Sequence, residues 1–227
     1  YPMAKRSEVL GAITNSSYNI CIAGTHGKTT TSTMVAHILR QSGYGCNAFL
    51  GGISVNYDTN FWPQANSGKS KKNVSVVEAD EYDRSFLKLN PDVAIISSMD
   101  PDHLDIYGTA ENMEQAFIEF SQKIKPEGLL LSKYGLKRTD DLKAHEHLTF
   151  HLHNENASVY AANIKMENGS YRFDVIMQYW ELRDVVLNMG GLYNIENMIA
   201  AISVAQYLEI ENDKISKAVA DFKGEKR

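Results

Sequence analysis

Short apolar runs alternate with segments of helical periodicity along most of the chain. Each run is mostly apolar without a clear alternation, which is typical of strands that are buried on both faces of a sheet. The expected strands are residues 18–23, 46–50, 74–77, 93–97 and 129–132. Strands separated by helices predict a mostly parallel sheet flanked by helices, so the expected fold class is α/β.

Helices are predicted between and after these strands. The helix after the first strand has its apolar residues on one face and should end near Gly43. Another should run from Thr109, an acceptable N-cap, to about Ile124. Its Phe117 and Phe120 should face the sheet. Helical periodicity returns near the C-terminus, at residues 194–208 and 213–222.

The pattern changes at about residues 148–188, where short segments alternate between apolar and polar positions. Two such segments, residues 158–166 and 170–177, are separated by a turn that contains Asn168-Gly169, which is a strong hairpin signal. A third segment, residues 181–187, continues the pattern. We expect a small antiparallel sheet attached to the parallel core.

Composition narrows the class of protein. The chain has 227 residues, of which 43% are apolar, so it can bury a substantial core in one or two domains, and one large domain is preferred. The net charge of −5, from 23 basic and 28 acidic residues, provides no broad basic field. Nucleic acid is therefore not an expected partner, and any affinity for phosphate must be local.

The expected compartment is the cytoplasm. Cys21 and Cys46 are too few for a disulfide framework, which fits a reducing environment. No apolar stretch is long enough to span a membrane, and the N-terminus has no apolar segment typical of a signal peptide.

A glycine-bounded turn follows the first expected strand, and it is the clearest chemical signal in the chain. Its residues are Gly24, Thr25, His26, Gly27, Lys28, Thr29 and Thr30. The glycines allow a tight turn whose N–H groups face a phosphate at the start of the next helix. Lys28 would neutralise the β- and γ-phosphates, and the Thr29 hydroxyl would bind Mg²⁺. The pattern G-x-x-x-x-G-K-[ST] fails only at Ile22, and the alternative is an ordinary turn with a helix cap.

Glu78 and His103 each lie just past the end of an expected strand. The carboxyl ends of parallel strands share one edge of the sheet, which is also the edge of the glycine turn. A carboxylate and an imidazole could hold a divalent cation there, either Mg²⁺ or Mn²⁺. The alternatives are a solvated loop acid for Glu78, among Asp80, Glu81 and Asp83, and a capping or loop histidine for His103.

A third signal is a glycine turn that opens a helix with Asn194 and Asn197 three residues apart. Side chains at this spacing share a face, and their amides could bind adenine or a ribose hydroxyl. The signal is weak alone, because asparagines at helix starts are more often caps.

Four short segments that contain the polar residues described above resemble segments of one known family, in the same order. The segments are residues 24–30, 78–83, 102–105 and 191–197. Together they resemble the central ATP-binding domain of the Mur ligases over nearly the whole chain. The resemblance implies a P-loop-type domain at residues 18–222, with linkers at residues 1–17 and 223–227. An N-terminal UDP-binding domain and a C-terminal domain would lie outside this stretch.

The resemblance also implies an activity, which is ATP-dependent amide bond formation through an acyl phosphate. The four segments are most similar to those of the family branch that joins L-alanine to UDP-N-acetylmuramate in peptidoglycan precursor synthesis. Lys28, Glu78 and His103 would then be catalytic. Residues 24–30 with Asn194 and Asn197 would bind ATP, and Thr29, Glu78 and His103 would hold metal ions.

Two positions depart from the family pattern. Tyr193 stands where the family usually has histidine, which affects the expected nucleotide contact. Phe117 stands where several sibling ligases carry a carbamylated lysine, so no carbamate ligand is expected.

Three alternatives stay open. A recycling ligase of the same family adds a whole tripeptide to the same sugar. Folate polyglutamylating enzymes use similar chemistry, but with different residues expected around Glu78. A non-catalytic nucleotide-binding module, or a P-loop kinase or switch, would leave Asp102 and His103 without a role.

Overall fold

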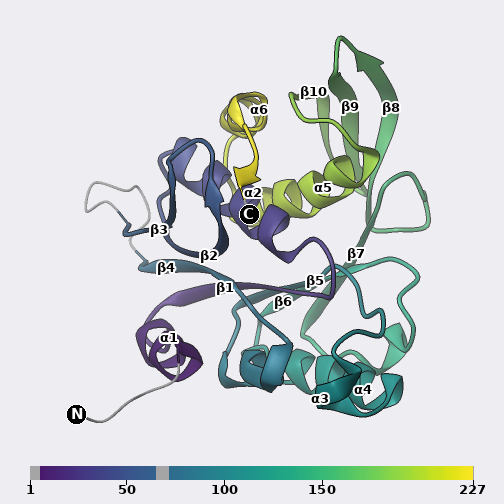
Figure 1. Ribbon diagram of the computed structural model, residues 1–227. Coiled ribbons are helices and arrows are strands. Elements are labelled where there is room, and N and C mark those ends of the chain that lie inside the picture. Colours follow the sequence, from purple (N-terminus) through teal and green to yellow (C-terminus); the bar gives the residue numbers. More distant parts are fainter. Residues whose placement is uncertain (1–5, 65–71, 227) are drawn as a thin grey trace.

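Strand β1 lies within a mixed sheet that runs through the whole molecule (Figure 1). The computed structural model describes residues 6–64 and 72–226. Within these ranges the strand order is β10-β9-β8-β7-β6-β5-β1-β4-β2-β11, and β3 pairs with β2 beside this path. The strands are β1 (Tyr18–Ala23), β2 (Asn47–Ser54), β3 (Thr59–Trp62), β4 (Val74–Glu78), β5 (Val93–Ile96), β6 (Leu129–Lys133), β7 (Glu146–His151), β8 (Val159–Glu167), β9 (Ser170–Met177), β10 (Trp180–Leu187) and β11 (Glu225–Lys226).

Helices cover both faces of this sheet. In Figure 1, α2, α5 and α6 lie on one side of the central strands, and α1, α3 and α4 lie on the other. The α-helices are α1 (Arg6–Thr14), α2 (Lys28–Gln41), α3 (Leu104–Tyr107), α4 (Ala110–Ser121), α5 (Leu192–Tyr207) and α6 (Asn212–Asp221), and the 3-10 helices are η1 (Tyr82–Lys88) and η2 (Thr139–Asp141). None of the described helices combines the length and apolar character needed to cross a bilayer.

The five strands predicted from apolar runs all form, and their pairing is parallel. β1 pairs with β4 on one side and with β5 on the other, β5 pairs with β6, and β4 pairs with β2. The α/β fold class is therefore confirmed. β2 is longer than predicted, and β3 was not predicted.

The apolar stretch of β1 from Ile20 to Ala23 follows from its position between two helical layers. Ile20 and Ile22 belong to the core on the α2 and α5 side, whereas Cys21 and Ala23 belong to the core on the α4 side. All four side chains are fully buried. A strand with one solvated face would alternate instead.

The helix predictions hold with small shifts at the ends. Thr109 is the N-cap of α4, and its hydroxyl accepts a hydrogen bond from the Asn112 amide at 3.2 Å. The helix ends at Ser121, three residues before the predicted end. Phe117 and Phe120 are fully buried against the sheet, and each ring contacts Phe86. α5 begins at residue 192, slightly before the predicted start.

The antiparallel region is continuous with the main sheet. β7 pairs in parallel with both β6 and β8, so the antiparallel part begins at β8 and not at residue 148 as predicted. β8, β9 and β10 are successive antiparallel neighbours. Asn168 and Gly169 form the predicted hairpin turn with φ angles of 51° and 82°, as two-residue turns of this kind require.

Regular structure also occurs in both segments predicted as linkers. α1 occupies residues 6–14 of the first segment. In the second, Glu225 and Lys226 form β11, which pairs antiparallel with Ser54 and Ile53 of β2. These linkers are therefore not simple extended connections. Residues 1–5 and 227 lie outside the described residues, and the domain boundaries stay predictions.

A buried histidine joins α2 to the elements on its outer side. His37 is 1% exposed, and its Nε2 lies 2.8 Å from the Ala218 carbonyl oxygen of α6. Its Nδ1 lies 2.9 Å from the Tyr57 hydroxyl. Because a carbonyl only accepts, Nε2 must donate, which leaves Nδ1 to accept from Tyr57. The neutral imidazole satisfies both contacts.

This arrangement predicts a loss of stability on acidification. Burial lowers the pKa of His37 from its ordinary value. Below that ordinary value the unfolded chain therefore binds a proton that the folded protein resists, and the free energy of unfolding falls as pH falls. Urea denaturation between about pH 7 and pH 5 should show this decline, and the His37→Gln variant should show a smaller one. The same substitution at exposed His145 is the control. Equal declines in the His37→Gln variant and the unaltered protein would contradict the assignment.

Candidate functional site

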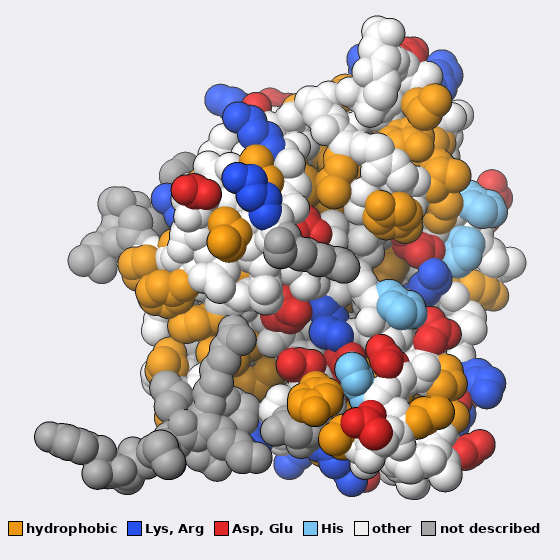
Figure 2. Space-filling view, in the orientation of Figure 1, with side chains coloured by type: hydrophobic (Ala, Val, Ile, Leu, Met, Phe, Trp, Pro, Cys, Tyr) orange, Lys and Arg blue, Asp and Glu red, His pale blue; other side chains and the backbone are white. Residues whose placement is uncertain are grey.

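The predicted site residues meet at the edge of the sheet where the parallel strands end. In the strand register, Ile22 of β1 is level with Glu78 of β4, and Ala23 is level with Ile96 of β5. The segments that follow β1, β4 and β5 therefore leave the sheet side by side. Figure 2 shows acidic, basic and histidine side chains gathered in the middle of this face.

The glycine turn is held by two serines that follow β5. Gly24 and Gly27 have φ angles of 136° and 81°, which side chains rarely allow, and a Cβ on Gly24 would collide with Ser97 Oγ. Ser98 Oγ accepts from the His26 amide at 2.8 Å and lies 2.9 Å from Thr25 Oγ1. Ser97 donates to the His26 carbonyl at 2.5 Å. The sequence interpretation missed both serines, although Ser97 ends and Ser98 directly follows the strand predicted at residues 93–97.

The N-terminus of α2 remains open to an anion. Gly27 is its N-cap, and the first hydrogen bond of the helix runs from the Thr31 amide to the Gly27 carbonyl. Among the described residues, no side chain accepts from the amides of Lys28, Thr29 or Thr30. Free N–H groups together with the helix dipole are an arrangement that favours anions, and a phosphate there stays a prediction.

Lys28 folds back over this turn. Its Nζ donates to the Gly24 carbonyl at 2.8 Å and forms an ion pair with Glu81 Oε1 at 2.7 Å. The Lys28 side chain is 14% exposed and that of Glu81 is fully buried. Burial raises the pKa of Glu81, and the contact with Lys28 opposes that rise. Sequence reasoning treated Glu81 only as one acid of a cluster.

Glu78 and Thr29 lie next to each other. Thr29 Oγ1 donates to Glu78 Oε1 at 3.1 Å, and Glu78 Oε2 accepts from the Gly51 amide at 2.8 Å. A hydroxyl and a carboxylate are the hard oxygen ligands that Mg²⁺ prefers, so these two residues fit the predicted ion. Gly51 is part of the site because a Cβ there would lie 2.5 Å from both carboxylate oxygens.

His103 joins the site through Glu81. Its Nε2 lies 3.8 Å from Glu81 Oε1 and 3.7 Å from Asp102 Oδ2. In the described part of the chain, the ion pairs of His103 and the hydrogen bonds of Glu78 do not include each other. Across residues 6–64 and 72–226, no group of three His, Cys, Asp or Glu side chains has the geometry to hold a metal ion. A second cation between Glu78 and His103 would need ligands from water or phosphate, and this pair stays a prediction.

The two asparagines of α5 separate into different roles. Gly27 lies against Asn197, since a Cβ on Gly27 would come within 2.9 Å of Asn197 Oδ1. Asn194 is 1% exposed and its Nδ2 donates to the Gly190 carbonyl at 2.6 Å, so it holds the turn before the helix. Tyr193 is 68% exposed. Nucleotide contact by either asparagine stays a prediction.

The remaining side chains of the turn have partners at its rim. His26 Nε2 lies 3.8 Å from Asp100 Oδ2, and both side chains are exposed. Thr30 Oγ1 donates to Glu225 Oε1 of β11 at 2.5 Å. The strand near the C-terminus therefore contacts the first turn of α2.

Comparison with known proteins decides the family. Residues 22–205 match the family described as Mur ligase middle domain. The chain belongs to the Mur ligase family.

Two curated relatives are similar to this Mur ligase domain over its whole length, and both are named UDP-N-acetylmuramate--L-alanine ligase. The protein from Parabacteroides distasonis is 44% identical over 227 residues, covering 100% of this chain and 48% of the relative. The protein from Flavobacterium johnsoniae is 42% identical, covering 100% and 47%. The chain spans about half the length of the curated relatives it matches.

Solved structures share the fold. The UDP-N-acetylmuramate-alanine ligase from Thermotoga maritima has a TM-score of 0.77 at 25% identity, covering 97% of this chain and 48% of that chain. The UDP-N-acetylmuramate:L-alanyl-gamma-D-glutamyl-meso-diaminopimelate ligase from Neisseria meningitides has a TM-score of 0.83 at 23% identity, covering 97% and 71%. The second likeness shows the fold alone.

Phe117 of this Mur ligase domain supplies no metal ligand. Its side chain is fully buried, 5.4 Å from the ring of Phe86. An apolar contact on the inner face of α4 therefore occupies the position considered for a carbamate.

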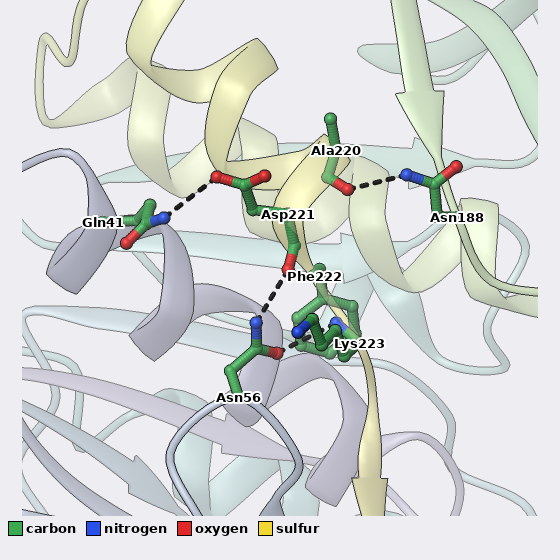
Figure 3. Close-up of a pocket in the computed structure, with 7 residues that line it drawn as sticks. All are labelled: Gln41, Asn56, Asn188, Ala220, Asp221, Phe222 and Lys223. Carbon is green, nitrogen blue, oxygen red and sulfur yellow. Dashed lines mark hydrogen bonds between the residues drawn. The ribbon is translucent and has the colours of Figure 1, made fainter.

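A separate pocket of about 480 Å³ lies away from the glycine turn, around the C-terminal end of α6 (Figure 3). Its polar groups bond to one another: Gln41 to the Asp221 carboxylate, Asn56 to the Asp221 carbonyl and Asn188 to the Ala220 carbonyl. These contacts fasten α6 to its neighbours, and they make the pocket a poor candidate for the active site.

Gly51 allows a test of Glu78 that leaves the carboxylate in the protein. The Gly51→Ala variant should push the Glu78 side chain away from Thr29, because the new Cβ would overlap both carboxylate oxygens. Glu78 is flexible at that end, so the variant should melt near the temperature of the unaltered protein. The Mg²⁺ concentration needed for half-maximal nucleotide binding should rise several-fold. Gly11→Ala in α1, where a Cβ meets nothing closer than 3.4 Å, is the control. An unchanged Mg²⁺ requirement in Gly51→Ala would argue against Glu78 as a ligand.

Proposed function

We propose that this domain binds ATP with Mg²⁺ at the glycine turn, and that the protein uses ATP to join L-alanine to UDP-N-acetylmuramate. One observation carries the proposal: Lys28, Thr29, Glu78 and His103 lie at the same edge of the sheet, around an open helix N-terminus. The names of the curated relatives support the choice of substrates.

The reaction must bring an anion to an anion. In the proposed first step a carboxylate oxygen of the sugar attacks the γ-phosphorus of ATP, the bond to the β-phosphate bridging oxygen breaks, and ADP leaves. The amine of alanine then attacks the acyl carbon, the bond to the phosphate oxygen breaks, and phosphate and a proton are released. Both steps need positive charge at the phosphates.

The residues of the turn supply that charge or its ligands. The Lys28 ammonium and the free amides of α2 would bind the β- and γ-phosphates. Thr29 and Glu78 would hold Mg²⁺, which supplies charge neutralisation when bound. His103, with Glu78, is proposed as the holder of a second ion. Asn197, beside Gly27, would contact the nucleotide.

We place this reaction in the cytoplasm. Cys21 and Cys46 are both free and buried, and burial raises the pKa of the Cys46 thiol to about 12. Inert buried thiols support a reducing compartment. Nucleic acid and membrane are not proposed as partners.

Removing the Lys28 charge should nearly abolish ligation. The Lys28→Ala variant should lower the rate by at least roughly a hundredfold, by analogy with removing one strong electrostatic donor. Lys28→Gln should be similarly impaired while keeping an N–H donor for Glu81, which separates lost charge from lost folding. Lys137→Ala removes a surface ammonium with 80% exposure and is the control. The measurement is phosphate release by the full-length protein. Turnover near that of the unaltered protein in either Lys28 variant would refute the role of Lys28.

The substrate assignment is tested with both amine substrates. The full-length protein with ATP, Mg²⁺ and UDP-N-acetylmuramate should release phosphate with L-alanine and not with L-alanyl-γ-D-glutamyl-meso-diaminopimelate. Release only with the tripeptide would assign the recycling reaction instead. Nucleotide binding without release in either mixture would identify a non-catalytic module.

A further inference from the structure

One carboxylate of the site has no role in the proposed chemistry, although it is the most deeply buried. Glu81 is 0% exposed and lies between β4 and η1. Buried carboxylates are rare unless they are paired, and a pair is costly to bury. A carboxylate buried beside the glycine turn therefore calls for a functional explanation.

The Lys28 ammonium is bound by two acceptors of the protein, and one of them is Glu81. A lysine ammonium has three N–H donors on a long, flexible side chain. Two of them are used within the protein, by the Gly24 carbonyl at 2.8 Å and by Glu81 Oε1 at 2.7 Å. One N–H remains for a ligand. With two fixed acceptors, the direction of the third N–H is fixed as well.

Glu81 is itself held by its surroundings. The Tyr107 hydroxyl of α3 donates to the Glu81 carbonyl oxygen at 2.6 Å, and this contact is buried. The Arg84 amide donates to the same carbonyl at 3.0 Å. The backbone of Glu81 is therefore fixed independently of Lys28, and its carboxylate can serve as a reference point for the ammonium.

The second oxygen of the carboxylate shows that the geometry is not arranged for stability alone. Glu81 Oε2 is buried and has no hydrogen-bond partner among the described residues. An unsatisfied buried oxygen is unfavourable. The carboxylate nevertheless takes the orientation in which Oε1 accepts from Lys28 and Oε2 has no partner among the described residues.

We infer that Glu81 is a positioning residue, which holds the Lys28 ammonium over the glycine turn with one N–H directed to the nucleotide phosphates. This inference rests on the proposed binding of nucleotide by Lys28. It competes with a second interpretation, in which Glu81 blocks Lys28 and must be displaced by phosphate.

The Glu81→Asp variant separates the two interpretations. It keeps the negative charge, so repulsion of phosphate is unchanged, but it withdraws the carboxylate by one methylene and breaks the contact with Lys28. Positioning predicts about tenfold weaker binding, as for loss of a charge-assisted hydrogen bond. Displacement predicts equal or tighter binding. Glu81→Gln keeps the reach of the side chain and should lose less affinity than Glu81→Asp.

Binding is measured by isothermal titration calorimetry with the β,γ-imido analogue of ATP and Mg²⁺, on the full-length protein. In a Lys28→Gln background, Glu81→Asp should change affinity less than about twofold, because its effect passes through Lys28. Glu119→Asp shortens a surface carboxylate paired with Arg84 at 3.1 Å and is the matched control. A second readout needs no nucleotide. The Glu81→Asp substitution should make Lys28 react faster with an amine-acylating reagent, and the mass of the peptide that contains Lys28 reports its acylation.

The inference about Glu81 and the proposed ligase reaction can fail separately. If the unaltered protein binds the analogue but releases no phosphate with L-alanine, the ligase reaction fails and the inference about Glu81 stands. The inference is overturned if the Glu81→Asp variant binds the analogue as tightly as the unaltered protein. It is also overturned if Glu81→Asp lowers the affinity for the analogue by the same factor with Lys28 present and in the Lys28→Gln background. If the unaltered protein binds no nucleotide, both are overturned.

Discussion

The parallel pairing of β1 with β4 on one side and β5 on the other fixes where the polar side chains of the site lie. Parallel strands end at a common edge, so the segments after Ala23, Glu78 and Ile96 leave the sheet together. Helices cover both faces of β1, and its buried apolar side chains fit that position. The polar chemistry therefore depends on the packing of a strand whose core side chains, from Ile20 to Ala23, are apolar.

The site gathers more negative than positive charge around a helix N-terminus. Glu78 and Glu81 both approach the start of α2, and the Lys28 ammonium contacts Glu81. A polyphosphate would add further negative charge, so bound cations are a physical requirement of the arrangement. The two carboxylates have different surroundings: Glu78 is bonded to a hydroxyl and an amide, and Glu81 to an ammonium. One suits a metal ion and the other fixes a lysine.

The glycine turn is supported by elements distant in sequence. Ser98 holds the His26 amide, Asn197 of α5 lies against Gly27, and Glu225 of β11 binds Thr30. The N-terminus of α2 and the turn before it therefore contact the segment after β5, helix α5 and strand β11. A displacement of any of these elements would alter the glycine turn directly.

The sequence directly predicted the parts of this protein that depend on neighbouring residues. The strand, glycine turn and helix from Tyr18 to Gln41 follow from local apolar pattern and backbone preference, as does the Asn168-Gly169 hairpin. It also placed Glu78 and His103 at one edge, because strand ends in a parallel sheet obey a general rule. The pairing of Lys28 with Glu81, the contact of Ser98 with the turn and the different surroundings of Asn194 and Asn197 were not predicted. Those contacts join side chains that are far apart in the chain, and their distances depend on how the helices and loops pack, which no local pattern encodes.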